Sequence, residues 1–470
     1  MSDSTTEVDY LVIGAGTAGM AFTDTLIGHS DRTVMMVERR HAPGGHWNDA
    51  YPFVRLHQPS AFYGVDSREL GNNRIDETGY NAGLYERASG LEILAYYRSV
   101  MEDHFRLFGQ VTFLPMSDAV VDRGRVAVTS RLTGSVREIT VRRKVVDARY
   151  LEGAIPATHR RSFDVDDDAR CIAVNDLVRV DEAADGFIVL GGGKTSMDAC
   201  LWLLDNGVDP DAITWIRPRD AWFLPRDTVQ PRVKAGDTII STAAIVEAAA
   251  SAVSARDLFE RLEAAGSLSR LDSSVEPTMY RGATASRSEL EALRRITRVI
   301  RGRRVRRIVR DRIVFDDGDL MTTGRPLYVD CTASALSVPP VRPVFEDGRV
   351  TIQPLLAGLP SFSAALTGYI EATREDTAEQ NRLAPPSRYP VTANDWISIR
   401  RDGMLALARW AQVDDVQSWV QRTRLNLTSG AETHMTEPRV AEAAATTRML
   451  GKLAVENLTK LSLDLEPEGR

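Results

Sequence analysis

Cysteine is scarce in this sequence. The three cysteines, Cys171, Cys200 and Cys331, are far apart and form no C-x-x-C or C-x-x-x-x-C pair. This spacing argues against a redox-active disulfide, and three residues are too few for a disulfide framework. We therefore expect a reducing, cytoplasmic setting, and no metal site is predicted.

Long hydrophobic runs are absent too. No apolar stretch approaches the roughly 20 residues that cross a bilayer as a helix. The opening residues Met1–Glu7 lack the basic and apolar parts of a signal peptide. A net charge of −7 favours neither nucleic acid nor an anionic membrane surface. We expect neither nucleic acid nor a membrane among the partners.

One basic stretch departs from this balance. Residues 301–312 contain seven arginines, but no aromatic side chain on which bases could stack lies among them. The interleaved valines and isoleucine, followed later by Asp316, Asp317 and Gly318, predict a solvated strand face and a hairpin with an Asp-Gly turn.

What is present is a pair of glycine turns, each placed between an apolar strand and a helix. The first turn carries Gly14, Gly16 and Gly19, and the second carries Gly191, Gly193, Lys194, Thr195 and Ser196. In such units the glycines allow close backbone approach, so that dinucleotide phosphates bind the free N–H groups at the helix start. The two turns predict two dinucleotides.

The residues beyond each turn predict which dinucleotide it binds. Glu38 ends the apolar run after the first turn, where a carboxylate can accept both ribose hydroxyls of FAD or NAD. After the second turn the corresponding run ends at Arg217, with Arg219 close behind, and a guanidinium can pair with the 2′-phosphate of NADP. We predict FAD at the first turn and NADPH at the second. Because Ser196 replaces the third glycine, a degenerate turn kept for packing is the alternative there.

A chain of 470 residues exceeds one ordinary core, so several domains are expected. We predict an α/β protein with two Rossmann-like dinucleotide-binding domains. An FAD-binding domain would span residues 1–165 and 326–372, with an NADPH-binding domain, 166–325, inserted between them and a helical region at 373–470. The strand within Leu327–Ser334 is expected to rejoin the first sheet.

A third motif follows Glu38. It reads Gly44-Gly45-His46-Trp47 and continues into the segment Tyr51–Ser60. Here the sequence resembles the class B-type flavin-dependent monooxygenases, which include the animal flavin-containing monooxygenases and the plant YUCCA enzymes. The resemblance covers most of residues 8–225. It implies cofactor contacts for Gly45, Trp47 and Ser60, and catalytic positions beside the flavin ring for Arg55, His57 and Gln58.

The resemblance also implies a function. We expect an FAD-containing, NADPH-dependent monooxygenase that uses O2 to hydroxylate a small organic molecule through a flavin hydroperoxide. This intermediate persists only if water is excluded from the flavin and a hydrogen-bond donor stabilises the peroxide. The F-x-G-x-x-x-H fingerprint of the family is absent between the two turns. Two alternatives stay open: an NADPH-linked FAD oxidoreductase without oxygen insertion, and a non-catalytic flavin-binding scaffold.

Overall fold

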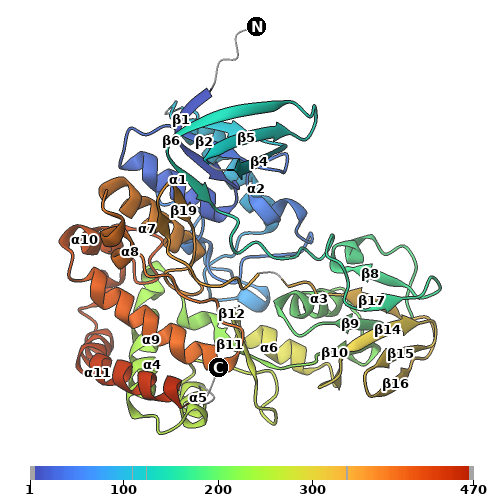
Figure 1. Cartoon of the computed structure of the whole chain (residues 1–470). Helices are drawn as coiled ribbons and strands as arrows, with labels where there is room; N and C mark the ends of the chain where they lie inside the picture. The colour runs from blue at the N-terminus through green and yellow to red at the C-terminus, as the bar shows by residue number, and fades with distance from the viewer. Residues whose placement is uncertain (1–5, 108, 123, 335–336, 465–470) are drawn as a thin grey trace.

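The described residues form two large β-sheets, two smaller ones and a set of C-terminal helices (Figure 1). The computed structural model describes residues 6–107, 109–122, 124–334 and 337–464. Residues 1–5, on which the expectation about a signal peptide partly rests, lie outside the described residues. Figure 1 places the first sheet at the top, the second at the right and the C-terminal helices at the lower left.

The first sheet is built around the N-terminal strand. Its path is β18-β19-β6-β1-β2-β3, and β4 and β5 extend it from β6 as an antiparallel pair. β1 lies parallel to β2 and β6, and its residues from Val8 onward are buried, as a strand covered on both faces requires. The strands are β1 (Thr6–Ile13), β2 (Val34–Val37), β3 (Val111–Leu114), β4 (Ser117–Asp122), β5 (Arg125–Ser130), β6 (Val136–Asp147), β18 (Phe345–Glu346) and β19 (Arg349–Thr351).

The second sheet is parallel throughout, in the order β13-β10-β9-β17-β8. Strand β9 is central and leads through the second glycine turn into α3 (Lys194–Asp205), so this unit has the Rossmann arrangement. The predicted α/β fold with two Rossmann-like units is confirmed. The strands are β8 (Cys171–Ala173), β9 (Phe187–Leu190), β10 (Ile213–Ile216), β13 (Arg298–Ile300) and β17 (Leu327–Asp330).

The prediction that the strand within Leu327–Ser334 rejoins the first sheet is wrong. Strand β17 pairs with β9 and β8 of the second sheet, and the chain rejoins the first sheet only at β19, which lies parallel to β6. The second unit is still inserted into the first, but the chain leaves it after residue 330 rather than at 326. An apolar strand carries no mark of the sheet that will accept it, and this pairing is decided by contacts distant in sequence.

The arginine-rich stretch forms the predicted solvated hairpin. Strands β14 (Val305–Val309), β15 (Arg312–Phe315) and β16 (Gly318–Met321) form an antiparallel meander, and β14 also pairs with β7 (Asp164–Val165). Phe315 pairs with Gly318, so the turn residues are Asp316 and Asp317, and the predicted Asp-Gly turn is wrong because Gly318 already belongs to β16. Arg306 and Arg307 are exposed and pair with Asp316 and Asp166.

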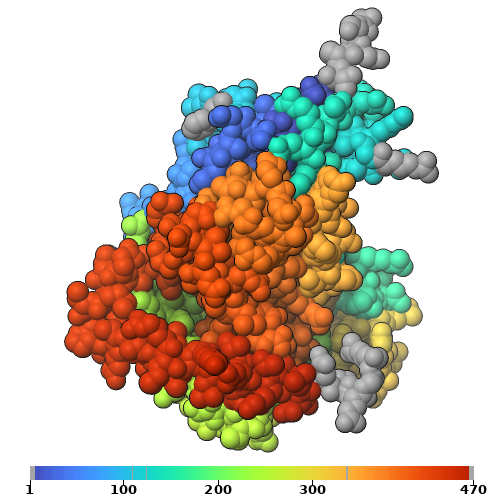
Figure 2. Space-filling model, turned by 60° about the vertical axis from the view of Figure 1, so that its left-hand side comes forward, coloured from blue at the N-terminus to red at the C-terminus, as the bar shows by residue number. Residues whose placement is uncertain are grey.

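Helices cover the first sheet and build the region below it. Helix α11 packs on α4 and α9, and α7 packs along α1. Figure 2 shows the C-terminal helices, orange to red, forming one face of the molecule between the N-terminal unit and α5. The helices are α1 (Thr17–Gly28), α2 (Gly90–Ser99), α4 (Ala235–Ser251), α5 (Ala255–Ala264), α6 (Arg287–Arg294), α7 (Pro360–Thr373), α8 (Thr377–Leu383), α9 (Ala393–Trp410), α10 (Asp414–Arg422) and α11 (Pro438–Leu463).

Two further strands lie near the junction of these parts. β11 (Ala221–Pro225) and β12 (Met279–Ala285) pair in parallel and flank the helical insertion α4–α5 in the chain. Residues 243–265 within it are rich in alanine, the residue with the highest helix propensity. Within the described ranges, no helix has the length and apolarity that would let it cross a membrane.

The packing at Gly19 yields a stability prediction. A Cβ added there would lie 2.0 Å from the carbonyl oxygen of Gly14, so Gly19→Ala must displace the turn and should cost about 1–3 kcal/mol or more. Gly28, at the other end of α1, has no atom within 4 Å of an added Cβ. Gly28→Ala is the matched control and should leave the thermal midpoint unchanged or slightly higher. Equal midpoints for both variants would contradict the close packing of the turn.

Candidate functional site

The first glycine turn adopts the conformation that its motif predicts. Gly14 has a φ of +103°, which favours glycine, and Gly16 is the N-cap of α1. The first N–H groups of a helix have no intrahelical acceptor, so the start of α1 can bind an anion.

The Gly44-Gly45 motif packs directly on this turn. The backbone N–H of Gly44 donates to the carbonyl of Ala15 at 2.8 Å, and a Cβ on Gly45 would lie 2.9 Å from Cα of Gly16. The two glycine motifs predicted separately from the sequence therefore form one backbone cradle, and Trp47 follows within it.

Four polar side chains converge at the start of α1. Trp47 donates from Nε1 to the hydroxyl of Tyr63 at 2.7 Å, and Tyr97 donates to Oγ1 of Thr17 at 2.9 Å. Thr17 and Tyr63 are also hydrogen-bonded to each other. Burial raises the pKa values of Tyr63 and Tyr97, so both hydroxyls remain protonated donors. Thr17 could have been found from its position after the turn; the two tyrosines have no local signal.

Glu38 completes this first site. Its side chain is buried, with Oε2 accepting from the N–H of Ala15 at 2.9 Å and Oε1 accepting from the N–H of Arg40 at 3.0 Å. A carboxylate oxygen can accept two hydrogen bonds. Glu38 can therefore hold the turn and still accept from a ribose diol.

The second turn is equally tight. Gly191 has a φ of +126°, and a Cβ there would lie 2.6 Å from the carbonyl oxygen of Cys331. Gly193 is the N-cap of α3, and Lys194 begins that helix. The hydroxyl of Ser196 donates to the carbonyl of Gly193 at 2.7 Å and is fully buried, so Ser196 serves the packing of the turn.

Arg217 lies beneath the second turn. It is 3% exposed, its Nη2 is 2.8 Å from Oδ1 of Asp220, and its guanidinium covers the ring of Trp215. Burial lowers its pKa. The sequence showed no acid directly after the strand, but Asp220, three residues on, is the partner of Arg217.

Arg219 has different surroundings. The residue is exposed, and its pKa is lowered by partial burial and by the neighbouring positive charges of Arg304 and Arg281. In the part of the chain that the structure describes, none of these three arginines forms an ion pair. The cluster of Arg219, Arg281 and Arg304 is a cationic surface beside the second turn.

The segment Tyr51–Ser60 joins the two units. Tyr51 donates its hydroxyl to Oδ2 of Asp198 in α3 at 2.8 Å. The ring of Phe53 stacks on Trp202 with centroids 5.4 Å apart. This segment follows the first cradle in the chain and is anchored on the helix of the second turn, so it lies where two dinucleotides would meet.

His57 is held in this segment by its backbone. Its carbonyl accepts from Nε of Arg226 at 2.9 Å and from the hydroxyl of Thr284. Its ring nitrogens have no hydrogen bond to any described residue. Burial, with Lys194 next in effect, lowers the pKa of His57 to about 4. The imidazole is therefore neutral at physiological pH.

The other residues of the segment divide into two groups. Gln58 donates from Nε2 to the carbonyl of Gly358 at 3.4 Å. Gly358 lies just before α7, and Gln58 lies at the same junction as His57. Arg55 is exposed and donates to the carbonyl of Arg87 at 2.9 Å. Ser60 is buried and bonds the backbone at Glu86 and Ala88. Arg55 and Ser60 thus anchor the segment.

A buried charge network surrounds His57. Arg226 donates from Nη2 to Oε2 of Glu289 at 2.7 Å, while Arg87 and Lys194 lie 3.4 Å and 3.9 Å from the other oxygen. Lys194 also pairs with Asp198. Burial alone would raise the pKa of Glu289, but the three cations lower it to about 2. Sequence reasoning missed Glu289, Arg226 and Arg87, because nothing local to each residue marks its partners.

The C-terminal region reaches the first cradle through Arg424. Its guanidinium donates to the carbonyls of Ala61 at 2.5 Å, Tyr63 at 2.9 Å and Arg68 at 2.6 Å. One side chain from beyond α10 therefore fixes the loop that carries Tyr63. No sequence motif marks Arg424 for this role.

The fold and the site define a protein with two Rossmann-like dinucleotide units and an anchored segment between them. The chain belongs to the family of the uncharacterized protein Rv2000 of Mycobacterium tuberculosis, with which it is 44% identical over 444 residues, 93% of this chain and 81% of the relative. The uncharacterized protein Mb2023 of Mycobacterium bovis matches to the same extent. No family model matches the chain.

Solved structures also show similarity. A steroid monooxygenase bound to NADP is 14% identical with a TM-score of 0.49, covering 96% of this chain and 98% of its own. A closed cyclohexanone monooxygenase is 15% identical with a TM-score of 0.46, over 97% and 98%. A bacillithiol disulfide reductase from Bacillus cereus is 14% identical with a TM-score of 0.44, over 78% and 100%.

The neutral state of His57 gives a pH prediction. Its pKa is about 4 in the folded protein against an ordinary value of 6.5 for histidine, so the unfolded chain binds the proton more readily between these values. Stability should therefore fall as the pH drops from about 6.5 towards 4. His57→Gln should flatten this fall in thermal midpoints measured across the range. An unchanged pH profile would show that the imidazole titrates normally.

Proposed function

We propose that this protein is an FAD-containing, NADPH-dependent monooxygenase of a small organic molecule. The observation that carries the proposal is the segment Tyr51–Ser60, which is anchored on both dinucleotide units and presents a neutral imidazole at their junction. A reaction between two cofactors needs such a junction, because both reactive rings must reach one place.

The first cradle fits FAD. A side chain at Gly19 or Gly45 would fill the space that the backbone needs for close approach. The start of α1, with Thr17 and Tyr97, would hold the diphosphate, and Glu38 would hold the ribose. Trp47 would cover the cofactor from the loop that follows Gly45.

The second turn fits NADPH with one change from the sequence prediction. Gly191, Gly193 and Thr195 remain the residues proposed at the diphosphate. Arg217 is committed to Asp220, so the 2′-phosphate is assigned to Arg219 with Arg281 and Arg304. An uncompensated cluster of guanidinium groups suits a dianionic phosphate.

When bound, FAD would accept hydride from NADPH and, in its reduced form, would activate O2. The chain supplies position and polarity. A neutral imidazole can donate from one ring nitrogen and accept at the other, and the amide of Gln58 offers a further donor. Preorganised donors of this kind typically contribute about 3–4 kcal/mol in a water-poor site.

The monooxygenase and its two alternatives predict different fates for the electrons of NADPH. An NADPH-linked oxidoreductase would bleach the flavin absorbance with NADPH under nitrogen and, in air, return the electrons only as hydrogen peroxide or to another acceptor. A scaffold would not bleach. A monooxygenase would convert part of the NADPH consumed into oxygenated product.

The first test concerns His57 and Gln58. We expect His57→Ala and Gln58→Ala to keep bound flavin and near-normal bleaching by NADPH, but to shift NADPH consumption from product to hydrogen peroxide. Arg55→Ala, an exposed change in the same segment, is the control and should not shift this ratio. Stopped-flow traces in which bleaching is crippled would assign the two residues to hydride transfer or to structure. No bleaching in the unmodified protein would overturn the proposed function.

The second test concerns the nucleotide. Arg219→Ala and Arg304→Ala should each weaken NADPH binding about ten- to a hundredfold and leave NADH binding nearly unchanged, since only NADPH carries the 2′-phosphate. Titration of flavin bleaching against each nucleotide measures both. Arg310→Ala removes an equal charge from the same strand meander and serves as the control. Equal losses of affinity for NADPH and NADH would show that these arginines do not bind the 2′-phosphate.

A further inference from the structure

The hydroxyl of Tyr63 lies beside Thr17, the first residue of α1. It accepts from Nε1 of Trp47 and is hydrogen-bonded to Oγ1 of Thr17, which also accepts from the hydroxyl of Tyr97. The four side chains carry four polar hydrogens, and these three hydrogen bonds use three of them. One hydroxyl hydrogen, on Thr17 or Tyr63, is left for a further acceptor next to the first turn.

A dinucleotide diphosphate at the start of α1 is an acceptor of the right kind. The first backbone N–H groups of this helix attract an anion, and Thr17 follows the N-cap Gly16 directly. Burial raises the pKa of Tyr63, so its hydroxyl stays protonated. A hydrogen bond to an ionised oxygen is stronger than one between neutral groups. The hydroxyls of Thr17 and Tyr63 therefore extend the site that the glycine turn begins.

Tyr63 is held in place by the C-terminal region. Residues 61–68 form a loop that we name the Tyr63 loop. The guanidinium of Arg424 donates to four backbone carbonyls of this loop, those of Ala61, Tyr63, Val65 and Arg68. Replacing Arg424 would remove the donor that these carbonyls share, and a carbonyl left without its donor is costly.

Two further contacts tie the Tyr63 loop to the later part of the chain. Oγ1 of Thr423, the residue before Arg424, donates to Oδ1 of Asp66 at 2.6 Å. The backbone N–H of Gly64 donates to Oγ of Ser361 on α7 at 3.2 Å. Thr423 and Ser361 are both buried, so water competes little for these bonds. The loop is therefore docked on residues that lie far along the chain from α1.

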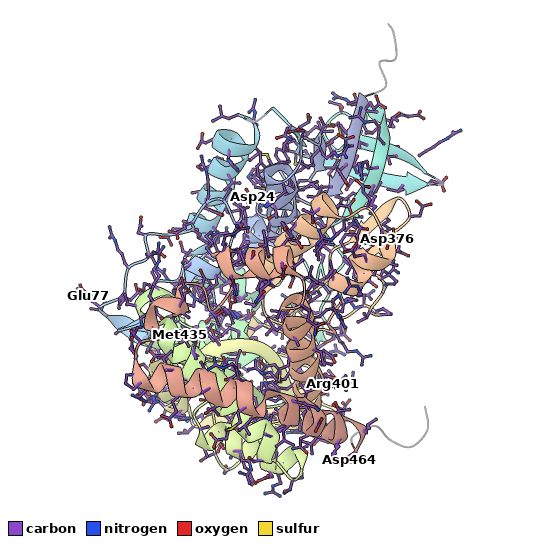
Figure 3. The ribbon with its side chains drawn as sticks, turned by 90° about the vertical axis from the view of Figure 1, so that its left-hand side faces the viewer. Asp24, Glu77, Asp376, Arg401, Met435 and Asp464 are labelled. Atoms are coloured by element: carbon purple, nitrogen blue, oxygen red, sulfur yellow. The ribbon has the colours of Figure 1, made fainter. Side chains whose placement is uncertain are left out.

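The first unit holds the other end of the Tyr63 loop. The backbone N–H of Ser67 donates at 3.0 Å to Oδ2 of Asp24 on α1, a residue that Figure 3 labels. The backbone N–H of Val65 donates to the hydroxyl of Tyr96 on α2 at 2.8 Å. The loop thus bridges the first unit and the C-terminal region, and the position of Tyr63 depends on both.

We propose that Tyr63 is an additional ligand of the FAD diphosphate and that Arg424 is the positioning residue that keeps it there. The C-terminal region then controls how tightly the flavin is held. This inference rests on the proposed function for the presence of FAD, and it gives a role to a part of the chain that carries no cofactor motif.

The test measures how tightly the holoprotein holds FAD in the absence of NADPH. Each protein is diluted in steps and filtered, and the fluorescence of the free flavin gives the dissociation constant. We expect Tyr63→Phe to weaken FAD binding about ten- to a hundredfold, because a hydrogen bond to a charged group is lost. Arg424→Gln should weaken it by a similar factor. Arg424→Lys should weaken it less, because lysine keeps the charge but lacks the planar fork that reaches several carbonyls.

A double variant distinguishes positioning from a separate structural effect. If Arg424 acts through Tyr63, adding Arg424→Gln to Tyr63→Phe should weaken FAD binding little further, whereas independent effects would multiply. Multiplied losses would overturn the proposal. If Arg424→Gln yields no folded protein, Thr423→Val replaces it, because it removes only the hydroxyl that holds Asp66 in the same loop. Its loss should be smaller and should likewise not multiply with that of Tyr63→Phe.

Arg422→Gln is the matched control. It removes the same charge two residues earlier, at the exposed last position of α10, and it should bind FAD normally. A loss of FAD affinity in Arg422→Gln equal to that in Arg424→Gln would show an effect of net charge and would overturn the positioning role.

The outcomes also separate this inference from the proposed function. Normal FAD affinity in Tyr63→Phe and Arg424→Gln would overturn the inference while leaving flavin bleaching by NADPH untouched. Losses of FAD affinity that do not multiply would support it even if NADPH failed to bleach the flavin. In that case the monooxygenase proposal alone would fail.

Discussion

The buried carboxylate of Glu289 is the interaction on which the junction of this protein depends. It is 2% exposed and faces three cations: Arg87 from the first unit, Lys194 from the start of α3, and Arg226 from the segment before α4. Removing one member of a buried ion pair costs about 3–5 kcal/mol. Here one carboxylate faces three cations, of which only Lys194 has a second carboxylate, Asp198. The capping box of α6 fixes Glu289 in turn, since Ser286 and Glu289 bond each other's backbone N–H groups.

The consequence of this network is that the backbone at His57 is rigid while its ring is available. Arg226 uses one nitrogen on Glu289 and another on the carbonyl of His57. The same positive charges help to keep the imidazole neutral. Structural charge and candidate chemistry are therefore linked: the ion pairs that hold the units together also set the protonation state of the residue between them. Arg424 acts similarly at the first cradle, where it holds the loop carrying Tyr63.

Much of the architecture was predictable because it rests on short-range rules. The two glycine turns, Glu38 after β2, the hairpin at β15–β16 and the helices of the insertion all follow from residues close together in the chain. The prediction for Leu327–Ser334 was wrong because any open sheet edge can accept an apolar strand. Arg217 was assigned to a phosphate because its partner Asp220 lies off the strand, in the loop that leads to β11. Arg55 and His57 are two residues apart, yet one lies on the surface and the other at the junction.

The sequence by itself determined the two strand–turn–helix units and their order, because turn chemistry and hydrophobic periodicity act over a few residues. Only the tertiary structure decided which charges are neutralised. Tyr51 donates to Asp198, Arg226 pairs with Glu289, and Arg217 pairs with Asp220. The physical reason is that the energy of a charge depends on its burial and on partners that are brought close only when the sheets and helices pack. No local pattern in the chain encodes those contacts.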